Sequence, residues 1–492
     1  MRGVGLLRIR PITAILLAGC MPAFAQSPEM AAVDRIFADF TTAGSPGCAV
    51  GVFRDGKIIY AKGYGLANVE ENVPITPQTV FDIGSTSKQF TAASILLLEK
   101  QGKLSVRDDV RKYIPELPDY GVPITLLNLL NHTSGLRDYL TLMELAGINI
   151  DGVTTDDDAL AIIARQKKLN FPPGSDYLYS NSGFFLLSVV VKRASGRPLR
   201  EFAQENIFAP LGMTHTQYRD DHTSLISNRA LAYERKDNGG GYALDVSYFE
   251  QTGDGAVHTT VEDLQRWDEN FYTAQIGGKE FLAELQEQGK LTSGKMLDYA
   301  KGLAILEFRG LRAVAHAGSW GGYRAQLVRF PDQHFSVACL CNVGNANTAR
   351  LAGRVAEVYL SSLLKPAEPA PTQQEPESKP LDSMKLSAAD LAAYGGDYWS
   401  DELRVTYRLA GEDGRLAVKD VIGADLVSRP AGITHRVFLP VAADQFKSER
   451  SQFELHFNRD ERHAIDGFTL DAGRTRGMYF SRCDSHPCPG TR

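Results

Sequence analysis

Short apolar runs near both ends of the first 360 residues have the pattern of β-strands. The segment CAVGVFRDGKIIYAKGYG, residues 48–65, places two apolar runs around an Asp-Gly pair, which favours a tight hairpin turn. Strand-like runs return much later, at residues 313–316, 323–330 and 335–341. The pattern therefore predicts strands from distant parts of the chain.

The region between these strands has helical patterning. The segment TAASILLLEKQG, residues 91–102, reads as a helix that ends at Gly102, a residue typical of helix C-termini. Further helices are predicted at residues 125–131, 182–195 and 260–273. Strands at both ends with helices between them predict an α+β fold, an α/β sandwich in which helices flank an antiparallel sheet.

The pattern changes after residue 364. Residues 365–380, KPAEPAPTQQEPESKP, are rich in Pro and Glu without an apolar period, which is typical of an extended, semi-rigid linker. Beyond it apolar residues alternate with polar ones, as in residues 403–409. Short strands with charged turns predict a small all-β barrel or sandwich over residues 381–482, of which a lipocalin-like barrel is the preferred form, followed by a tail at 483–492. The barrel could bind a ligand, cap the active site or stabilise a dimer.

The N-terminus has the features of an export signal. Three arginines precede a short apolar run at residues 12–18, and an Ala-Phe-Ala site follows at residues 23–25. This pattern predicts a secretory signal peptide over residues 1–25 and a periplasmic location. An alternative is open, because residues 17–20 resemble a bacterial lipobox, in which an acylated Cys20 would anchor a lipoprotein to the membrane.

The overall composition is that of a globular protein. The 492 residues are 43% hydrophobic and 23% charged, which suffices for a large core. A formal net charge of −6 without a Lys/Arg block gives no electrostatic basis for a nucleic-acid partner. Among six cysteines, Cys483 and Cys488 could close a small disulfide, whereas Cys339 and Cys341 share a strand face and are not expected to pair together.

A candidate catalytic pair lies in the segment FDIGSTSKQF, residues 81–90. Ser85 and Lys88 stand at the start of a predicted helix, where residues three apart share one face. Serine becomes a nucleophile when a base takes its proton, and lysine can be that base if burial lowers its pKa. The S-x-x-K motif alone carries little weight, because residues 362–365 match it as well and receive no function here.

Two further segments give that motif its context. Tyr179 and Asn181, in the triplet Y-S-N, can face one pocket, the phenol for proton transfer and the amide to orient a substrate. Residues 316–323, HAGSWGGY, follow a strand-like run near the end of the first domain. Their small residues would let the strand backbone approach a ligand closely.

Together, the three motifs resemble those of the penicillin-recognising serine hydrolases, closest to class C β-lactamases and the related D-amino-acid peptidases and esterases. Those proteins have S-x-x-K, then Y-x-N, then K-T-G or H-x-G on an edge strand. The resemblance covers roughly residues 30–360. Other stretches that resemble the family are LLNHTSGL (129–136), PPGSDYLYSNSGFFLL (172–187), FAPLGM (208–213) and VEDLQRW (261–267).

The resemblance implies a catalytic role for three side chains. Ser85 would be the nucleophile that forms an acyl-enzyme, and Lys88 would be its proton partner. Tyr179 would act as general base and acid. The mechanism would be acylation followed by deacylation by water.

The resemblance also implies the substrate-binding groups. Asn181 would position a substrate amide, and the strand that carries His316 and Gly318 would line the site. The backbone N–H groups of Ser85 and Ser319 would form the oxyanion hole. No cofactor or metal is implied, and the ten histidines show no HExxH or comparable ligand spacing.

The implied function is that of an exported serine hydrolase, with its catalytic domain and a helical subdomain in residues 26–364. Its partner would be a small-molecule or peptide substrate, and a small ester or a D-amino-acid peptide ranks before a β-lactam. The alternatives are a β-lactamase or D-Ala-D-Ala carboxypeptidase, and a non-catalytic penicillin-binding or sensor protein. The oligomeric state stays open.

This ranking follows from one departure from the family pattern. His316 and Ala317 stand where β-lactamases usually have Lys and Thr, which would hold a substrate carboxylate. Neutral histidine carries no fixed charge near pH 7, and alanine has no hydroxyl. A missing charged hydrogen bond costs about 1.5–3 kcal/mol, or roughly one to two decades in selectivity.

The departure generates a testable prediction. Combining His316→Lys with Ala317→Thr should raise activity on carboxylate-bearing β-lactams relative to neutral esters, because it restores a cation and a hydroxyl on the strand. The ratio of kcat/KM for a chromogenic cephalosporin and a nitrophenyl ester measures the effect. An unchanged ratio would show that the carboxylate argument is wrong.

Overall fold

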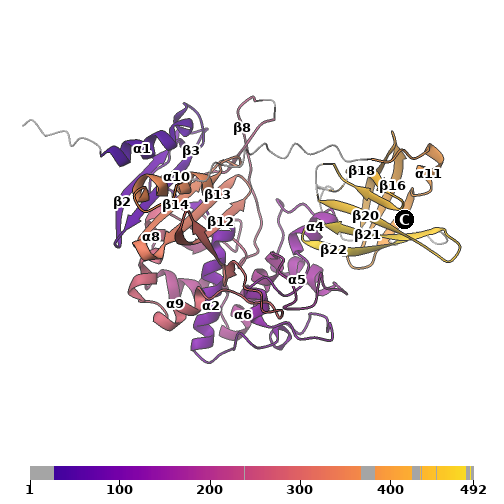
Figure 1. Ribbon diagram of the computed structural model, residues 1–492, viewed down its shortest axis with the longest axis horizontal. Coiled ribbons are helices and arrows are strands. Elements are labelled where there is room, and N and C mark those ends of the chain that lie inside the picture. Colours follow the sequence, from indigo (N-terminus) through magenta and orange to yellow (C-terminus); the bar gives the residue numbers. More distant parts are fainter. Residues whose placement is uncertain are drawn as a thin grey trace, which may run out of the picture.

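The computed structural model confirms the predicted fold class: an antiparallel sheet with helices, followed by a β-barrel (Figure 1). It describes residues 27–237, 239–366, 383–423, 433, 435–449, 452–483 and 488. The predicted signal peptide, with Cys20, and nearly all of the predicted linker lie outside these residues. Within the described ranges, no helix combines the length and the apolar character needed to cross a bilayer.

Seven antiparallel strands from both ends of the first domain form the main sheet. The predicted hairpin is β1–β2, and its Asp55-Gly56 turn has φ values of 50° and 71°, the left-handed conformation that a tight two-residue turn requires. β1 pairs on its other side with β14, which joins the two ends of the domain. In spatial order the strands are β10 (Tyr299–Ala300), β11 (Leu303–Phe308), β12 (Leu311–Trp320), β13 (Tyr323–Phe330), β14 (Phe335–Cys341), β1 (Cys48–Arg54) and β2 (Lys57–Tyr64).

Helices pack on both faces of this sheet because its strands are apolar on both sides. Alternate residues of β1 enter two separate cores: Val50 and Val52 share one with α1 and α10, and Ala49 and Phe53 share the other with α2 and α8. The bounds of these helices are α1 (Pro28–Ile36), α10 (Thr348–Leu360), α2 (Lys88–Lys100) and α8 (Val261–Thr273).

A disulfide joins the two halves of the sheet. Cys48 of β1 lies opposite Cys341 of β14, and the two sulfurs are bonded although 293 residues separate them in sequence. Cys339 lies on the same buried face, with its sulfur 3.9 Å from that of Cys341, and does not pair with it, as predicted. The expected disulfide between Cys483 and Cys488 is present in the tail.

The predicted helices at 125–131 and 182–195 belong to the helical subdomain. α6 begins at Asn181 and is followed by Gly196, whose φ of 78° gives the left-handed cap that ends many helices. Its buried face packs against α2 and α3. The helices of the subdomain are α3 (Leu126–Leu130), α4 (Tyr139–Leu145), α5 (Asp156–Ala164) and α6 (Asn181–Ser195).

The C-terminal strands close into an eight-stranded antiparallel barrel, in which each strand pairs with the next and β22 returns to β15. Aromatic side chains pack its interior: the ring centroid of Phe468 lies 5.2 Å from that of Phe457 and 4.7 Å from that of Phe480. This packing argues against a ligand site inside the barrel. The strands are β15 (Gly396–Ser400), β16 (Val405–Glu412), β17 (Arg415–Gly423), β18 (Val437–Ala442), β19 (Gln445–Lys447), β20 (Phe453–Arg459), β21 (Ile465–Ala472) and β22 (Thr475–Arg482).

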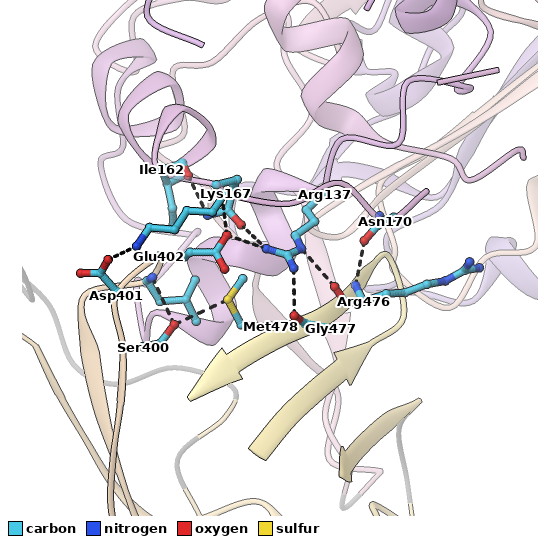
Figure 2. Close-up of polar contacts among 12 residues, drawn as sticks. Arg137, Ile162, Lys167, Asn170, Ser400, Asp401, Glu402, Arg476, Gly477 and Met478 are labelled. Atoms are coloured by element: carbon cyan, nitrogen blue, oxygen red, sulfur yellow. Dashed lines mark hydrogen bonds and ion pairs between the residues drawn. The ribbon is translucent and has the colours of Figure 1, made fainter. Parts of the chain in front are cut away.

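A buried ion pair docks the barrel onto the helical subdomain (Figure 2). Arg137 Nη1 lies 2.7 Å from Glu402 Oε2, and these side chains are only 1% and 9% exposed. Arg137 also donates hydrogen bonds to the backbone carbonyls of Arg476 and Gly477 in β22. One buried side chain of the first domain therefore binds two separate parts of the barrel.

Replacing Glu402 by alanine should weaken this docking, because Arg137 would stay buried without its counter-charge. We expect the free energy of unfolding to fall by about 3–5 kcal/mol, measured by urea unfolding of the full chain. Asp401→Asn is the matched control, since its ion pair with Lys167 is exposed on both sides and is worth about 0–1 kcal/mol. Equal losses in the two variants would contradict a dominant buried pair.

Candidate active site

Close backbone packing sets the position of Ser85. The short turn η2 (Gly84–Ser87) leads directly into α2, and it lies so close to β12 that a Cβ at Gly84 would be 2.6 Å from Ser319 N. Gly84 also has a φ of 48°, which favours glycine. Position 84 therefore requires glycine for two reasons. The close packing that this glycine allows brings Ser85 next to Ser319.

β12 is not an edge strand of the sheet, because β11 pairs with its first half. That pairing extends only to Ala315, however, and within the part of the chain that the structure describes, residues 316–320 pair on one side, with β13. The part of β12 that carries His316, Gly318 and Ser319 thus has a free edge. The sequence predicted that the H-x-G motif lies on an edge strand. The unpaired edge is present locally, at the residues of that motif.

Lys88 is completely buried behind Ser85. Its Nζ lies 3.0 Å from Ser85 Oγ, 3.0 Å from Asn181 Oδ1 and 2.5 Å from the carbonyl oxygen of Asp254. Loss of hydration lowers the pKa of Lys88 to about 7. A neutral amine keeps two N–H groups, which match the two carbonyl-type oxygens, so that its lone pair can face the Ser85 hydroxyl. Lys88 can therefore accept the serine proton near neutral pH.

Tyr179 lies beside this pair and remains a neutral phenol. Burial raises its pKa well above the usual range, although a hydrogen bond with Ser85 opposes the rise. The side-chain nitrogen of Lys88 lies 5.0 Å from the centroid of the tyrosine ring. The structure thus brings Ser85, Lys88 and Tyr179 together, with an amine and a phenol hydroxyl beside the same serine.

His132 holds the backbone before α6. Its Nδ1 accepts a hydrogen bond from Ser180 N at 3.2 Å, and its ring centroid lies 4.1 Å from that of Tyr179. Burial holds the pKa of His132 well below its usual range, so the imidazole is neutral. The residue supports Tyr179 by packing and by this hydrogen bond.

His316 is neutral, and both of its ring nitrogens have partners. Nδ1 lies 2.6 Å from the carbonyl oxygen of Ala317, which can only accept, so Nδ1 carries the proton. Nε2 then accepts a hydrogen bond from the Tyr299 hydroxyl at 3.0 Å. Burial lowers the pKa of His316 to about 4. The strand therefore offers no cation at this position, in keeping with the sequence argument.

Asn181 is fixed in orientation from two sides. Its Oδ1 accepts from Lys88 Nζ, and its backbone N–H donates to Asp138 Oδ2 at 2.6 Å. The first contact leaves the amide nitrogen of the side chain as the group that can meet a substrate.

Asp254 is a buried carboxyl that the sequence analysis missed. Tyr139 donates a hydrogen bond to its Oδ2 at 2.9 Å, and burial raises the pKa of Asp254 to about 7. Its charge in turn raises the pKa of Lys88. The run DGAVHTT, residues 254–260, gave no periodic or spacing signal for this role.

These groups meet at a cleft of about 1000 Å³. Ser85 and Tyr179 line it, whereas Lys88 lies behind the wall. The remaining predicted residues that line the cleft are Asn181, His316, Gly318 and Ser319. One further wall residue, Arg474, comes from the barrel, and no sequence signal linked it to this site.

One group of potential metal ligands reaches the same cleft through His222 alone. Asp221, His222 and Glu250 are close enough to share an ion, but His222 Nδ1 is already 2.6 Å from Glu250 Oε1. Serine activation by an amine does not require a metal. We therefore derive the chemistry from Ser85, Lys88 and Tyr179 alone.

Comparisons with known proteins identify similar sequences and folds. The Beta-lactamase family profile matches residues 33–361. A D-aminopeptidase of Gluconobacter oxydans is 29% identical over 67% of this chain, and the match spans 61% of that protein's length. A D-aminopeptidase of Brucella anthropi is 24% identical over 89% of this chain and 95% of its own length. The octameric penicillin-binding protein homologue from Pyrococcus abyssi has the same fold, with a TM-score of 0.61 at 21% identity, and covers 92% of this chain and 98% of its own.

The lowered pKa of Lys88 predicts how Ser85 reactivity depends on pH. We expect labelling of Ser85 by a fluorophosphonate to accelerate as pH rises through about 7, because the neutral amine is the base and its pKa is about 7. Asp254→Asn should move the midpoint to lower pH, since the lost negative charge no longer raises that pKa. Intact-mass time courses between about pH 5 and 10 measure both midpoints. A wild-type midpoint near the ordinary lysine value would contradict the assignment.

Proposed function

This chain belongs to the beta-lactamase family, and from that membership and the site geometry we propose that it is a serine hydrolase that cleaves an amide or ester through an acyl-enzyme. One observation carries the proposal: Ser85 Oγ lies 3.0 Å from Lys88 Nζ, and the pKa of this buried amine is lowered to about 7. A nucleophile with an adjacent base is the minimal requirement for covalent catalysis.

In the first step, Ser85 Oγ attacks the carbonyl carbon of the substrate while neutral Lys88 takes the hydroxyl proton. The electron pair of the carbonyl bond moves to its oxygen, which becomes an oxyanion. The backbone N–H groups of Ser85 and Ser319 would stabilise this charge. The close approach of Gly84 to Ser319 supports that assignment, because it places Ser319 N next to the residue that precedes Ser85.

The intermediate then expels its leaving group. The bond from the acyl carbon to nitrogen or oxygen breaks, and the leaving group takes the hydroxyl proton of Tyr179. Protonated Lys88 returns a proton to Tyr179, so that both side chains are neutral again beside an acylated Ser85. In this scheme Lys88 is the base and Tyr179 relays protons, because burial lowers the pKa of the amine and raises that of the phenol.

Deacylation follows the same route with water as nucleophile. Water attacks the acyl carbon and loses a proton through Tyr179 to Lys88. Ser85 Oγ then leaves as the acid product forms, and Lys88 returns the proton to it. The steps balance without a cofactor.

Amides and peptides are the substrate class that we propose. The names of the Gluconobacter and Brucella relatives, both D-aminopeptidases, favour a D-amino-acid amide or peptide. The amide nitrogen of Asn181 is the side-chain group left to bind such a substrate. Small esters remain within the proposal because the same acyl-enzyme can form from them.

We also propose that the protein is exported. Two disulfides, Cys48–Cys341 and Cys483–Cys488, support this, since such bonds persist in oxidising compartments. Free release to the periplasm and anchoring through Cys20 are the two forms that export would take.

Covalent labelling tests the proposed hydrolase. The wild-type chain should form a one-to-one fluorophosphonate adduct and turn over at least one of a cephalosporin, a nitrophenyl ester and a D-alanyl anilide. Ser85→Ala should lose the adduct and lower kcat by at least about a hundredfold. Ser362→Ala, in the second S-x-x-K match, is the control and should change neither.

The same experiment separates the hydrolase from the non-catalytic binding alternative. A stable acyl-enzyme without steady turnover would support a penicillin-binding or sensor protein. Absence of any adduct in the wild-type chain would reject both.

A further inference from the structure

A turn of the barrel reaches the cleft of the first domain. β21 and β22 are joined by Gly473-Arg474, and Gly473 has a φ of 54°, which suits a tight hairpin turn. Ala472 and Thr475 pair directly across this turn. Arg474, at its tip, lines the same cleft as Ser85. The wall of the active site is therefore built from two domains.

Side chains of the helical subdomain fix the backbone of this turn. Asn170 Nδ2 donates to the Arg474 carbonyl oxygen at 3.0 Å, and Asn170 Oδ1 accepts from Arg476 N at 2.8 Å. Arg137 holds the next residues of β22, and Figure 2 shows both contacts on the hairpin. These hydrogen bonds therefore hold the backbone of Arg474 in place, and this fixes the position from which its side chain extends at the cleft.

The guanidinium of Arg474 lies against the catalytic tyrosine. Its central carbon is 4.8 Å from the ring centroid of Tyr179, and Nη1 lies 3.9 Å from Asp138 Oδ2, which already accepts from Asn181 N. Among the described residues, none makes a hydrogen bond to this guanidinium, and the side chain is 46% exposed. Its N–H groups are therefore available to a molecule in the cleft.

Arg474 is also the arginine whose charge reaches the reacting groups. It lowers the pKa of Tyr179 and of Lys88. Three other arginines line the cleft: Arg219 and Arg324 donate to backbone carbonyls, and the charge of Arg229 acts on His258 and Tyr323. The arginine whose charge acts on Tyr179 and Lys88 thus comes from the barrel rather than from β12.

We propose that Arg474 binds a carboxylate of the substrate, and that the barrel thereby supplies the anion-binding group that the strand with His316 and Ala317 lacks. The inference rests on the proposed hydrolysis at Ser85 and specifies its substrate class. The substrate is an amide or ester that carries a carboxylate on the leaving-group side, next to Tyr179. A planar guanidinium can hold such a carboxylate by two parallel hydrogen bonds.

This placement has a consequence for the opposite charge. A substrate with an ammonium group at the same position would meet the Arg474 cation and bind poorly. The preferred substrate charge should therefore follow the charge of the side chain at position 474. Arginine there should favour a substrate carboxylate, and a negative side chain should favour a substrate ammonium group.

A matched pair of substrates tests the proposal. N-acetyl-D-alanyl-D-alanine is used with a free C-terminal carboxylate and as the C-terminal amide, and kcat/KM is measured by release of the amine product. The wild-type chain should prefer the carboxylate form by about ten- to hundredfold, the range of one charge-assisted hydrogen bond. Arg474→Ala should bring that ratio close to one, Arg474→Lys should retain part of the preference, and Arg474→Glu should invert it, because its carboxylate repels that of the substrate.

Arg476→Ala is the matched control. Arg476 belongs to the same hairpin, its side chain is 47% exposed and pairs with Asp176, and it does not line the cleft. This variant should keep the wild-type ratio. A ratio that survives in Arg474→Ala, or falls equally in Arg476→Ala, overturns the proposal.

A second measurement keeps the inference separate from the proposed function. Both peptides are tested as protectants of Ser85 against fluorophosphonate labelling, which needs binding but no turnover. Stronger protection by the carboxylate form that disappears in Arg474→Ala supports the inference even if neither peptide is hydrolysed. Equal protection by the two forms in the wild-type chain refutes the inference, whereas loss of hydrolysis alone refutes only the proposed function.

Discussion

The burial of one amine is the constraint on which the active site depends. Lys88 can act as a base near neutral pH only where water is excluded, and a buried amine is tolerable only if its N–H groups find oxygen partners. Those partners come from separate elements: Asn181 begins α6, and Asp254 lies in the loop before β9 (Val257–Thr259). The base therefore exists only when the sheet and the helical subdomain are packed together.

Close backbone packing supplies the second half of the site. A Cβ at Gly318 would lie 1.8 Å from the carbonyl oxygen of Ile83, just as one at Gly84 would collide with Ser319 N. Two glycines on facing segments thus allow the turn before α2 to lie directly against β12. Burial sets the properties of the Lys88 amine, and the steric fit between the two segments positions the backbone N–H groups proposed for the oxyanion hole. Both act on the reaction at Ser85.

The parts that the sequence predicted have local signals, and the parts it missed depend on distant contacts. Ser85, Lys88 and Tyr179 stood out because each lies in a short motif next to a helix start or a turn. β12 was expected only at residues 313–316 but extends through Trp320, because pairing with β13 overrides the turn tendency of its glycines.

Two misses show the same limit more clearly. The disulfide partner of Cys341 could not be chosen without the register between β1 and β14, which brings in a residue from far up the chain. Arg474 reaches the cleft through the docking of a whole domain, held by Arg137 and by Asn170, and no pattern within the barrel strands encodes that contact. The barrel could be recognised as a domain, but its position could not.

The two-domain wall of the cleft also orders events in time. Ser85 belongs to the first domain and Arg474 to the barrel, and domains generally fold as units. A molecule in which the barrel has not yet docked can thus hold the reactive serine in a pocket that is still open on one flank, and docking completes the entrance.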